Sequence, residues 1–180
     1  TTDRFLSGQF ASYHVYPYYP DYYGFMDVMD IEVENKQEFV GADGVFNSYR
    51  AYLTTLNDYH TMPVVIAEFG VPSSRGRAQS DRNTQRAQGG MSEADQAEAL
   101  KTCYQDIMSA GCAGSIVFTW QDEWFKRTWN TMAYTDLTKT PYWSDVQTNE
   151  QFFGVLAFDP GDEKSVCYVD GDVSEWTADD

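Results

Sequence analysis

The sequence predicts an α/β fold, because strand-like and helix-like patterns alternate along the chain. The strand-like stretches are short β-branched or alternating apolar runs, whereas the helix-like stretches repeat apolar residues every three to four positions. In order, the five stretches are residues 8–18, 46–59, 63–69, 92–110 and 114–124. Strands that alternate with helices of this length form consecutive parallel β/α units.

The first strand is expected in residues 8–18, where side chains alternate between two faces until Pro17 ends the pattern. His14 and Tyr16 share one of these faces. The helix that follows is expected to cover a sheet with the apolar stripe Phe46, Tyr49, Leu53 and Leu56.

The second strand, residues 63–69, is apolar on both faces, which predicts a strand buried on both sides of a parallel sheet. The polar stretch that follows, residues 73–90, indicates a long loop and carries several arginines. Ser92 and Asp95 then form a variant of the capping box, and Gly111 ends the second helix.

The last of the five stretches places Ile116, Phe118 and Trp120 on one face of a third strand. Beyond about residue 140 the alternation ends, and turn signals separate short β-like runs at residues 152–158 and 165–169. The sequence therefore predicts three β/α units followed by a short β-rich C-terminal extension.

The composition argues against several kinds of partner. A formal charge of −16 leaves no basic surface for nucleic acid or for an anionic membrane. No stretch approaches the roughly 20 apolar residues of a membrane-spanning helix. The cysteines, Cys103, Cys112 and Cys167, have neither CxxC spacing nor nearby histidines. We therefore expect no metal site and no cofactor.

Glu68 stands at the end of the second strand, where an unpaired buried carboxylate would be costly. One explanation is an ion pair with an arginine of the following stretch. The other is catalysis, because functional groups gather at the carboxyl ends of the strands in parallel α/β folds.

Aromatic and polar side chains crowd the expected ends of the first and third strands. Sugars are bound by the faces of flat rings together with planar polar side chains that bond hydroxyls. Tyr16 and His14 are the candidates for a role beside Glu68. The candidates for substrate binding are Trp120, Tyr18, Tyr19, Trp124 and Gln121. For most of these aromatic residues, packing alone is the alternative.

Three of these motifs resemble, in order, the last three strands of the (β/α)8-barrel glycoside hydrolases of clan A. The stretch "ASYHVYPYYP" resembles the sixth strand, "VVIAEFGVPSS" the seventh and "SIVFTWQDEW" the eighth, over residues 8–130. The resemblance implies a partial (β/α)8 TIM barrel with Glu68 as the catalytic nucleophile and Tyr16 or His14 beside it. It also implies that Trp120 forms the floor of the sugar subsite and that carbohydrate is the partner.

The chain also departs from that family. A whole barrel needs about 250 residues, and the family's acid/base glutamate follows strand four. Residues 1–143 are therefore expected to be the C-terminal portion of a barrel, without the acid/base residue. Asn149–Glu150 follows the eighth strand and is not expected to replace it. Residues 144–164 would be a post-barrel segment and linker, and residues 165–180 resemble the start of a DOMON-like carbohydrate-binding β-sandwich.

Three functional hypotheses follow. The first is a fragment of a retaining glycoside hydrolase that acts on oligo- or polysaccharides and is inactive alone, in a protein expected at the cell surface or outside the cell. The second is a non-catalytic carbohydrate-binding module. The third is a half barrel that assembles into homo-oligomers, because the edge strands of an open parallel sheet need partners.

Overall fold

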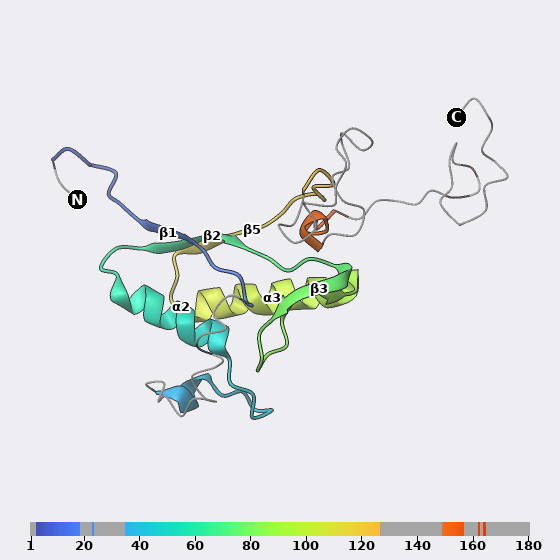
Figure 1. Ribbon diagram of the computed structural model, residues 1–180. Coiled ribbons are helices and arrows are strands. Elements are labelled where there is room, and N and C mark those ends of the chain that lie inside the picture. Colours follow the sequence, from blue (N-terminus) through green and yellow to red (C-terminus); the bar gives the residue numbers. More distant parts are fainter. Residues whose placement is uncertain are drawn as a thin grey trace.

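The computed structural model describes residues 3–18, 23, 35–126, 149–156, 162 and 164. Three strands form one parallel sheet in the order β1-β2-β5, namely β1 (Ala11–His14), β2 (Val64–Phe69) and β5 (Gly114–Val117). Two helices, α2 (Ser48–Tyr59) and α3 (Glu93–Ser109), lie on the same side of this sheet (Figure 1). The predicted alternation and the mixed α/β class with a parallel sheet are confirmed.

The hydrophobic core lies between the sheet and the two helices. Val64 and Ile66 of β2 are fully buried against Tyr49 and Leu53 of α2 and Ile107 of α3. Burial of each aliphatic side chain of this size contributes about 1.5–3 kcal/mol. Tyr49 and Leu53 of the predicted stripe therefore hold α2 to the sheet, and Ile107 does the same for α3. Phe46, which was expected in that stripe, precedes α2 and packs in a separate cluster with Ala51.

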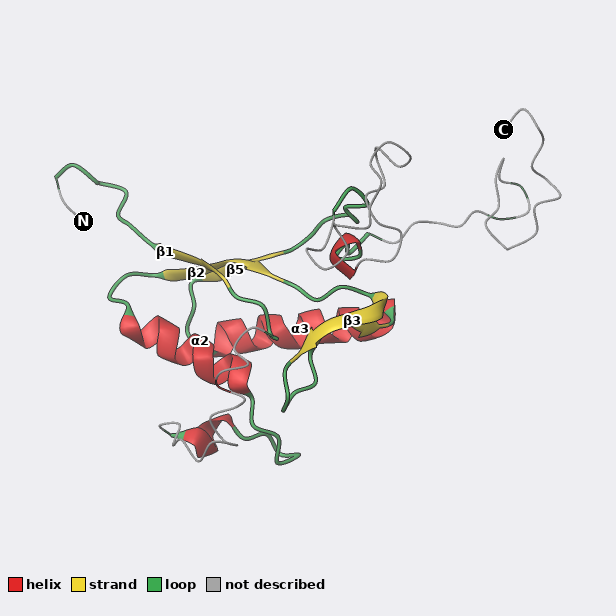
Figure 2. Cartoon of the chain, in the orientation of Figure 1, coloured by secondary structure: helices red, strands yellow, loops and turns green. Residues whose placement is uncertain are grey.

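The opposite face of β2 is not covered to the same degree. Val64 and Ile66 are completely buried, whereas Val65, Ala67 and Glu68 are only partly buried. The expectation of a strand buried on both faces is therefore wrong for the part of the chain that the structure describes. The physical reason is visible in Figure 2, where the two described helices, α2 and α3, lie on the same side of the sheet.

Residues 73–90 are not a loop, which corrects the second expectation. They form an antiparallel hairpin, here called the β3–β4 hairpin, of β3 (Ser74–Ser80) and β4 (Ala87–Met91). The strands were not predicted because their side chains are mostly polar or absent, so the apolar alternation typical of a strand is missing. Gly89 has a φ of 90°, and a Cβ there would clash with the carbonyl oxygen of Gly76. Only glycine fits this close approach of the two strands.

The other elements follow the sequence closely, with shifts at their ends. The capping box of α3 is confirmed, because Ser92 Oγ accepts from the Asp95 backbone N–H at 3.2 Å and Asp95 accepts in return from the Ser92 backbone N–H. The third strand ends at Val117, so Phe118 and Trp120 follow β5 rather than belong to it. The described residues also include the short 3-10 helices η1 (Lys36–Phe39) and η3 (Asn149–Gln151).

The tail was expected to be β-rich. The described residues 152–156 are not a strand, and most of the remaining tail, including residues 165–180, lies outside the described residues. In place of strand pairing, the described part makes isolated hydrogen bonds to the residues that follow β2 and β5.

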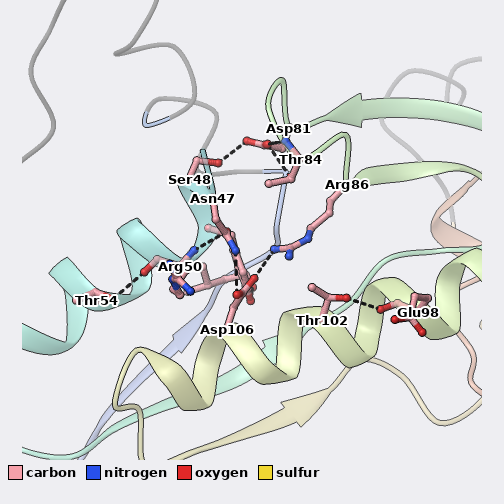
Figure 3. A network of polar contacts seen from close by, with 12 residues as sticks. Asn47, Ser48, Arg50, Thr54, Asp81, Thr84, Arg86, Glu98, Thr102 and Asp106 are labelled. Carbon is pink, nitrogen blue, oxygen red and sulfur yellow. Dashed lines mark hydrogen bonds and ion pairs between the residues drawn. The ribbon is translucent and has the colours of Figure 1, made fainter. Parts of the chain in front are cut away.

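A buried polar network joins both helices to the turn of the β3–β4 hairpin (Figure 3). Asp106 of α3 is ion-paired with Arg86, with 2.7 Å between Oδ2 and Nη1, and accepts a hydrogen bond from the Asn47 amide at 2.9 Å. Asp81, which is fully buried, accepts from the Ser48 hydroxyl at 2.6 Å. These contacts fix the hairpin relative to α2 and α3.

Candidate active site

Glu68 meets two side chains from the end of the neighbouring strand. The Tyr16 hydroxyl donates to Glu68 Oε2 at 2.7 Å, and His14 Nδ1 lies 3.2 Å from the same oxygen. His14 pairs with Glu68 across the parallel β1–β2 ladder, directly after an irregularity in the register. The structure therefore brings together the three residues that the sequence singled out as catalytic candidates.

Neighbouring groups hold Tyr16 in this position. The Tyr49 hydroxyl of α2 donates to the carbonyl of Val15 at 2.9 Å, which anchors the chain next to Tyr16. The Tyr16 ring makes edge-on contacts with Phe118 and Phe153, with ring centroids 6.4 and 5.9 Å apart. Aromatic contacts of this kind restrict the ring, so the hydroxyl is directed at Glu68 by packing as well as by its hydrogen bond.

The Tyr16 hydroxyl keeps its proton and so remains a hydrogen-bond donor to Glu68. Burial raises the pKa of Tyr16 far above its ordinary value, and the hydrogen bond to Glu68 with the charges of Glu68, Glu150 and Glu123 raises that pKa further. A phenol with a raised pKa stays protonated in neutral and moderately alkaline solution. Glu68 therefore keeps its donor over this range.

Glu68 is held on one side but is still accessible. Its side chain is 30% exposed and that of His14 is 60% exposed. A carboxylate at the carboxyl-terminal edge of a parallel sheet, oriented by a donor and reachable from solvent, can act as a nucleophile, as a base or as an acceptor for ligand hydroxyls.

The segment 149–156 returns to this edge of the sheet from far along the chain. Its backbone bonds to the residues after β2 and β5, since Ser73 N–H donates to the Phe152 carbonyl at 3.0 Å and Thr119 N–H donates to the Phe153 carbonyl at 3.0 Å. Figure 1 shows η3 beside the chain that leaves β5. These bonds place Phe153 against Tyr16.

Glu150 lies in the same segment. One of its carboxylate oxygens accepts a hydrogen bond from the side-chain amide of Gln88 on β4. Burial raises the pKa of Glu150, while the charge of Lys126 and the bond from Gln88 lower it. Lys126 is itself ion-paired with Glu123 at 2.9 Å and stands 4.2 Å from the centroid of the Phe118 ring.

The predicted substrate-binding residues differ in their exposure to solvent. Trp120 is 68% exposed and Gln121 is also exposed, whereas Trp124 is half-buried and hydrogen-bonded to Asp122. Tyr18 is 1% exposed and packs against Tyr16, with ring centroids 5.7 Å apart, so it supports that ring instead of presenting a face to solvent. Tyr19 lies outside the described residues.

Four residues near the site were not assigned to it from the sequence. Phe118 was read only as part of a strand face, and Phe153 as part of a β-like run. Gln88 was not predicted as a site residue, because it lies in the polar stretch that was interpreted as a loop. Glu150 was noticed beside Asn149 and set aside because it follows the last strand.

A cavity of about 790 Å³ lies elsewhere, between the residues before α2, the β3–β4 hairpin and α3. Arg50 and Arg86 line it, but both are engaged within the fold. Arg86 pairs with Asp106, and the Arg50 guanidinium donates to the Glu38 carbonyl at 2.6 Å. We place the candidate site at Glu68 because the three candidate residues, Glu68, Tyr16 and His14, converge there and do not line this cavity.

Comparisons with protein-family models, with curated proteins and with solved structures found no match for the chain. Among the described residues, no group of histidine, cysteine, aspartate and glutamate side chains is placed to hold a metal ion. The described helices include none with the length and apolar composition needed to cross a bilayer.

Proposed function

We propose that this chain is the C-terminal part of a retaining glycoside hydrolase, built as three units of a (β/α)8 barrel, with Glu68 as the nucleophile. One observation carries the proposal, namely the 2.7 Å hydrogen bond from Tyr16 to Glu68 at the carboxyl-terminal edge of a parallel sheet. The position of Glu68 at the end of the middle strand, with His14 beside it, supports the same assignment.

In the proposed reaction an oxygen of Glu68 attacks the anomeric carbon of a sugar. The bond from that carbon to the leaving oxygen breaks, and the bonding electrons stay with the oxygen. A second carboxylic acid, about 5–5.5 Å from the nucleophile in retaining enzymes, protonates the oxygen and then activates water to release the sugar. In this proposal that acid belongs to an earlier part of a longer protein, so the chain alone does not hydrolyse ordinary glycosides.

The nucleophile can be tested without the second acid. Glycosyl fluorides with fluorine in place of the hydroxyl next to the anomeric carbon need no protonation, because fluoride departs unaided. We expect such reagents to label the chain once, at Glu68, as measured by intact mass and peptide mapping. Glu68→Gln is expected to abolish labelling. Glu98→Gln, which changes an exposed glutamate on α3, is the matched control and is expected to label normally.

Tyr16→Phe is expected to slow this labelling by about ten- to a hundred-fold, because hydrogen bonds to charged groups contribute about 1.5–3 kcal/mol. The ring that packs against Phe118 is retained, so the fold is expected to persist. Tyr13→Phe is the matched control, since its hydroxyl contacts His60 at 2.7 Å. Equal labelling rates for the two phenylalanine variants would contradict the role proposed for Tyr16.

A carbohydrate-binding role without catalysis is the second candidate. The exposure of Trp120 favours it, because an indole that is 68% exposed offers a ring face for sugar stacking. The labelling experiment separates the two functions. A chain that binds sugars but is never modified at Glu68 is a binding module and not a hydrolase part.

A further inference from the structure

We infer that Glu150 is a substrate-binding residue of the Glu68 site, with Gln88 as the residue that positions it. The ligand class is a neutral sugar whose hydroxyl groups donate to the Glu150 carboxylate. The inference rests on the proposed function for the identity of the ligand, but it does not require Glu68 to be a nucleophile.

The first support is the way in which the segment 149–156 is fixed. Val155 N–H donates to the Thr119 carbonyl at 3.1 Å, and Gly154 N–H donates to Asp122 at 2.8 Å. The Gln151 side chain, 1% exposed, donates to the carbonyls of Trp124 and Lys126 at 2.9 and 3.2 Å. A segment held at this many points presents Glu150 from a defined position.

The second support is the contrast between Gln88 and Glu150. Gln88 is 6% exposed and donates to one oxygen of Glu150, whereas Glu150 itself is only partly buried. The amide is therefore too enclosed to meet a ligand directly. A carboxylate can accept about four hydrogen bonds, and the hydroxyl groups of a sugar are donors that it accepts.

The third support is the position of Glu150 relative to the catalytic pair. Phe153, three residues further along the same segment, packs edge-on against Tyr16 at 5.9 Å. Burial is the main cause of the raised pKa of the Tyr16 hydroxyl, and the charges of Glu68 and Glu150 raise it further. The segment that carries Glu150 therefore borders Tyr16, the residue that donates to Glu68.

The charges around Glu150 favour a neutral ligand over an anionic one. Glu68, Glu123 and Glu150 all act on Tyr16, and the charge of Lys126 is ion-paired with Glu123. A carboxylate-bearing sugar would be repelled here. Sugar hydroxyls, in contrast, gain charge-assisted hydrogen bonds to a carboxylate.

The experiment measures equilibrium binding by isothermal titration calorimetry. The probes are para-nitrophenyl α- and β-glycosides of glucose, galactose, mannose and xylose, titrated into the wild-type chain and its variants. We expect Glu150→Gln to weaken binding of the preferred glycoside by about ten-fold or more, the effect of losing charge-assisted hydrogen bonds. Glu98→Gln on α3 is the matched control and is expected to bind as the wild type does.

Gln88→Ala tests the positioning role. It is expected to weaken binding in the wild-type background but to have no further effect in the Glu150→Gln background, because the two residues act as one unit. A merely structural role of Gln88 would instead weaken binding equally in both backgrounds. Thermal unfolding of each variant verifies that the fold is retained.

The outcomes separate this inference from the proposed function. Weakened binding in Glu150→Gln together with an unlabelled Glu68 would support the inference and contradict the nucleophile. Unchanged binding in Glu150→Gln together with a labelled Glu68 would contradict the inference and support the nucleophile. A wild-type chain that binds none of the glycosides would overturn the inference.

Discussion

Replacing Asp106 with alanine is expected to lower the free energy of unfolding by about 3–5 kcal/mol, the usual cost of breaking a buried ion pair from one side. The Arg86 side chain is 10% exposed and its guanidinium lies 2.7 Å from Asp106, so the variant leaves a positive charge enclosed without its partner. The Asn47 amide loses its acceptor as well. Urea unfolding followed by circular dichroism measures the change.

Two further variants make this prediction specific. Asp106→Asn keeps the shape and an acceptor for Asn47 but removes the charge, so it is expected to cost less than alanine. Glu98→Ala removes an exposed ion pair with Lys101 and is expected to change stability by about 1 kcal/mol or less. If Asp106→Ala were as mild as Glu98→Ala, the buried pair would not be holding the hairpin to α3.

Gly70→Ala is expected to damage both the fold and the site. A Cβ at Gly70 would lie far inside van der Waals contact of the Phe118 carbonyl oxygen and 3.2 Å from the Phe153 ring. The hydrogen bond from the Phe118 backbone N–H to the Phe69 carbonyl, which is 2.8 Å long, must then lengthen. Such overpacking costs about 1–3 kcal/mol, and a displacement of about 1 Å at a reacting group slows chemistry about a hundred-fold. Labelling of Glu68 is expected to fall by that factor.

The same sheet offers a matched control for this change. A Cβ at Gly114, on β5, would meet no atom within 4 Å. Gly114→Ala is therefore expected to leave both the urea midpoint and the labelling rate close to those of the wild type. Normal labelling in Gly70→Ala would mean that the spacing of Phe69 and Phe118 does not set the position of Glu68.

The polar network and the candidate site are physically connected through the β3–β4 hairpin. The turn of the hairpin is fixed by Asp81 and Arg86, and β4 begins at Ala87, directly before Gln88. Gln88 in turn bonds to Glu150. Loss of the Arg86–Asp106 pair is therefore expected to loosen the position of Glu150 in addition to lowering stability.

Much of the fold could be predicted because its signals are local. The alternation of residues 8–18 defines β1, the stripe that includes Tyr49 and Leu53 defines α2, and the capping box at Ser92 begins α3. Each signal depends on residues close together in the chain, so neighbouring side chains are sufficient to reveal it. The β3–β4 hairpin was missed because its strands are polar and its close glycine contact is visible only when both strands are in place.

The sequence by itself determined the order of strands and helices, and it placed Glu68, Tyr16 and His14 at neighbouring strand ends. That much follows from periodicity and from the rule that consecutive β/α units run parallel. Only the tertiary structure decided that the Tyr16 hydroxyl bonds to Glu68, that one face of β2 stays partly uncovered and that Glu150 meets Gln88 near the site. The physical reason is distance along the chain. Glu150 and Gln88 are 62 positions apart, and no local pattern shows that folding brings them together.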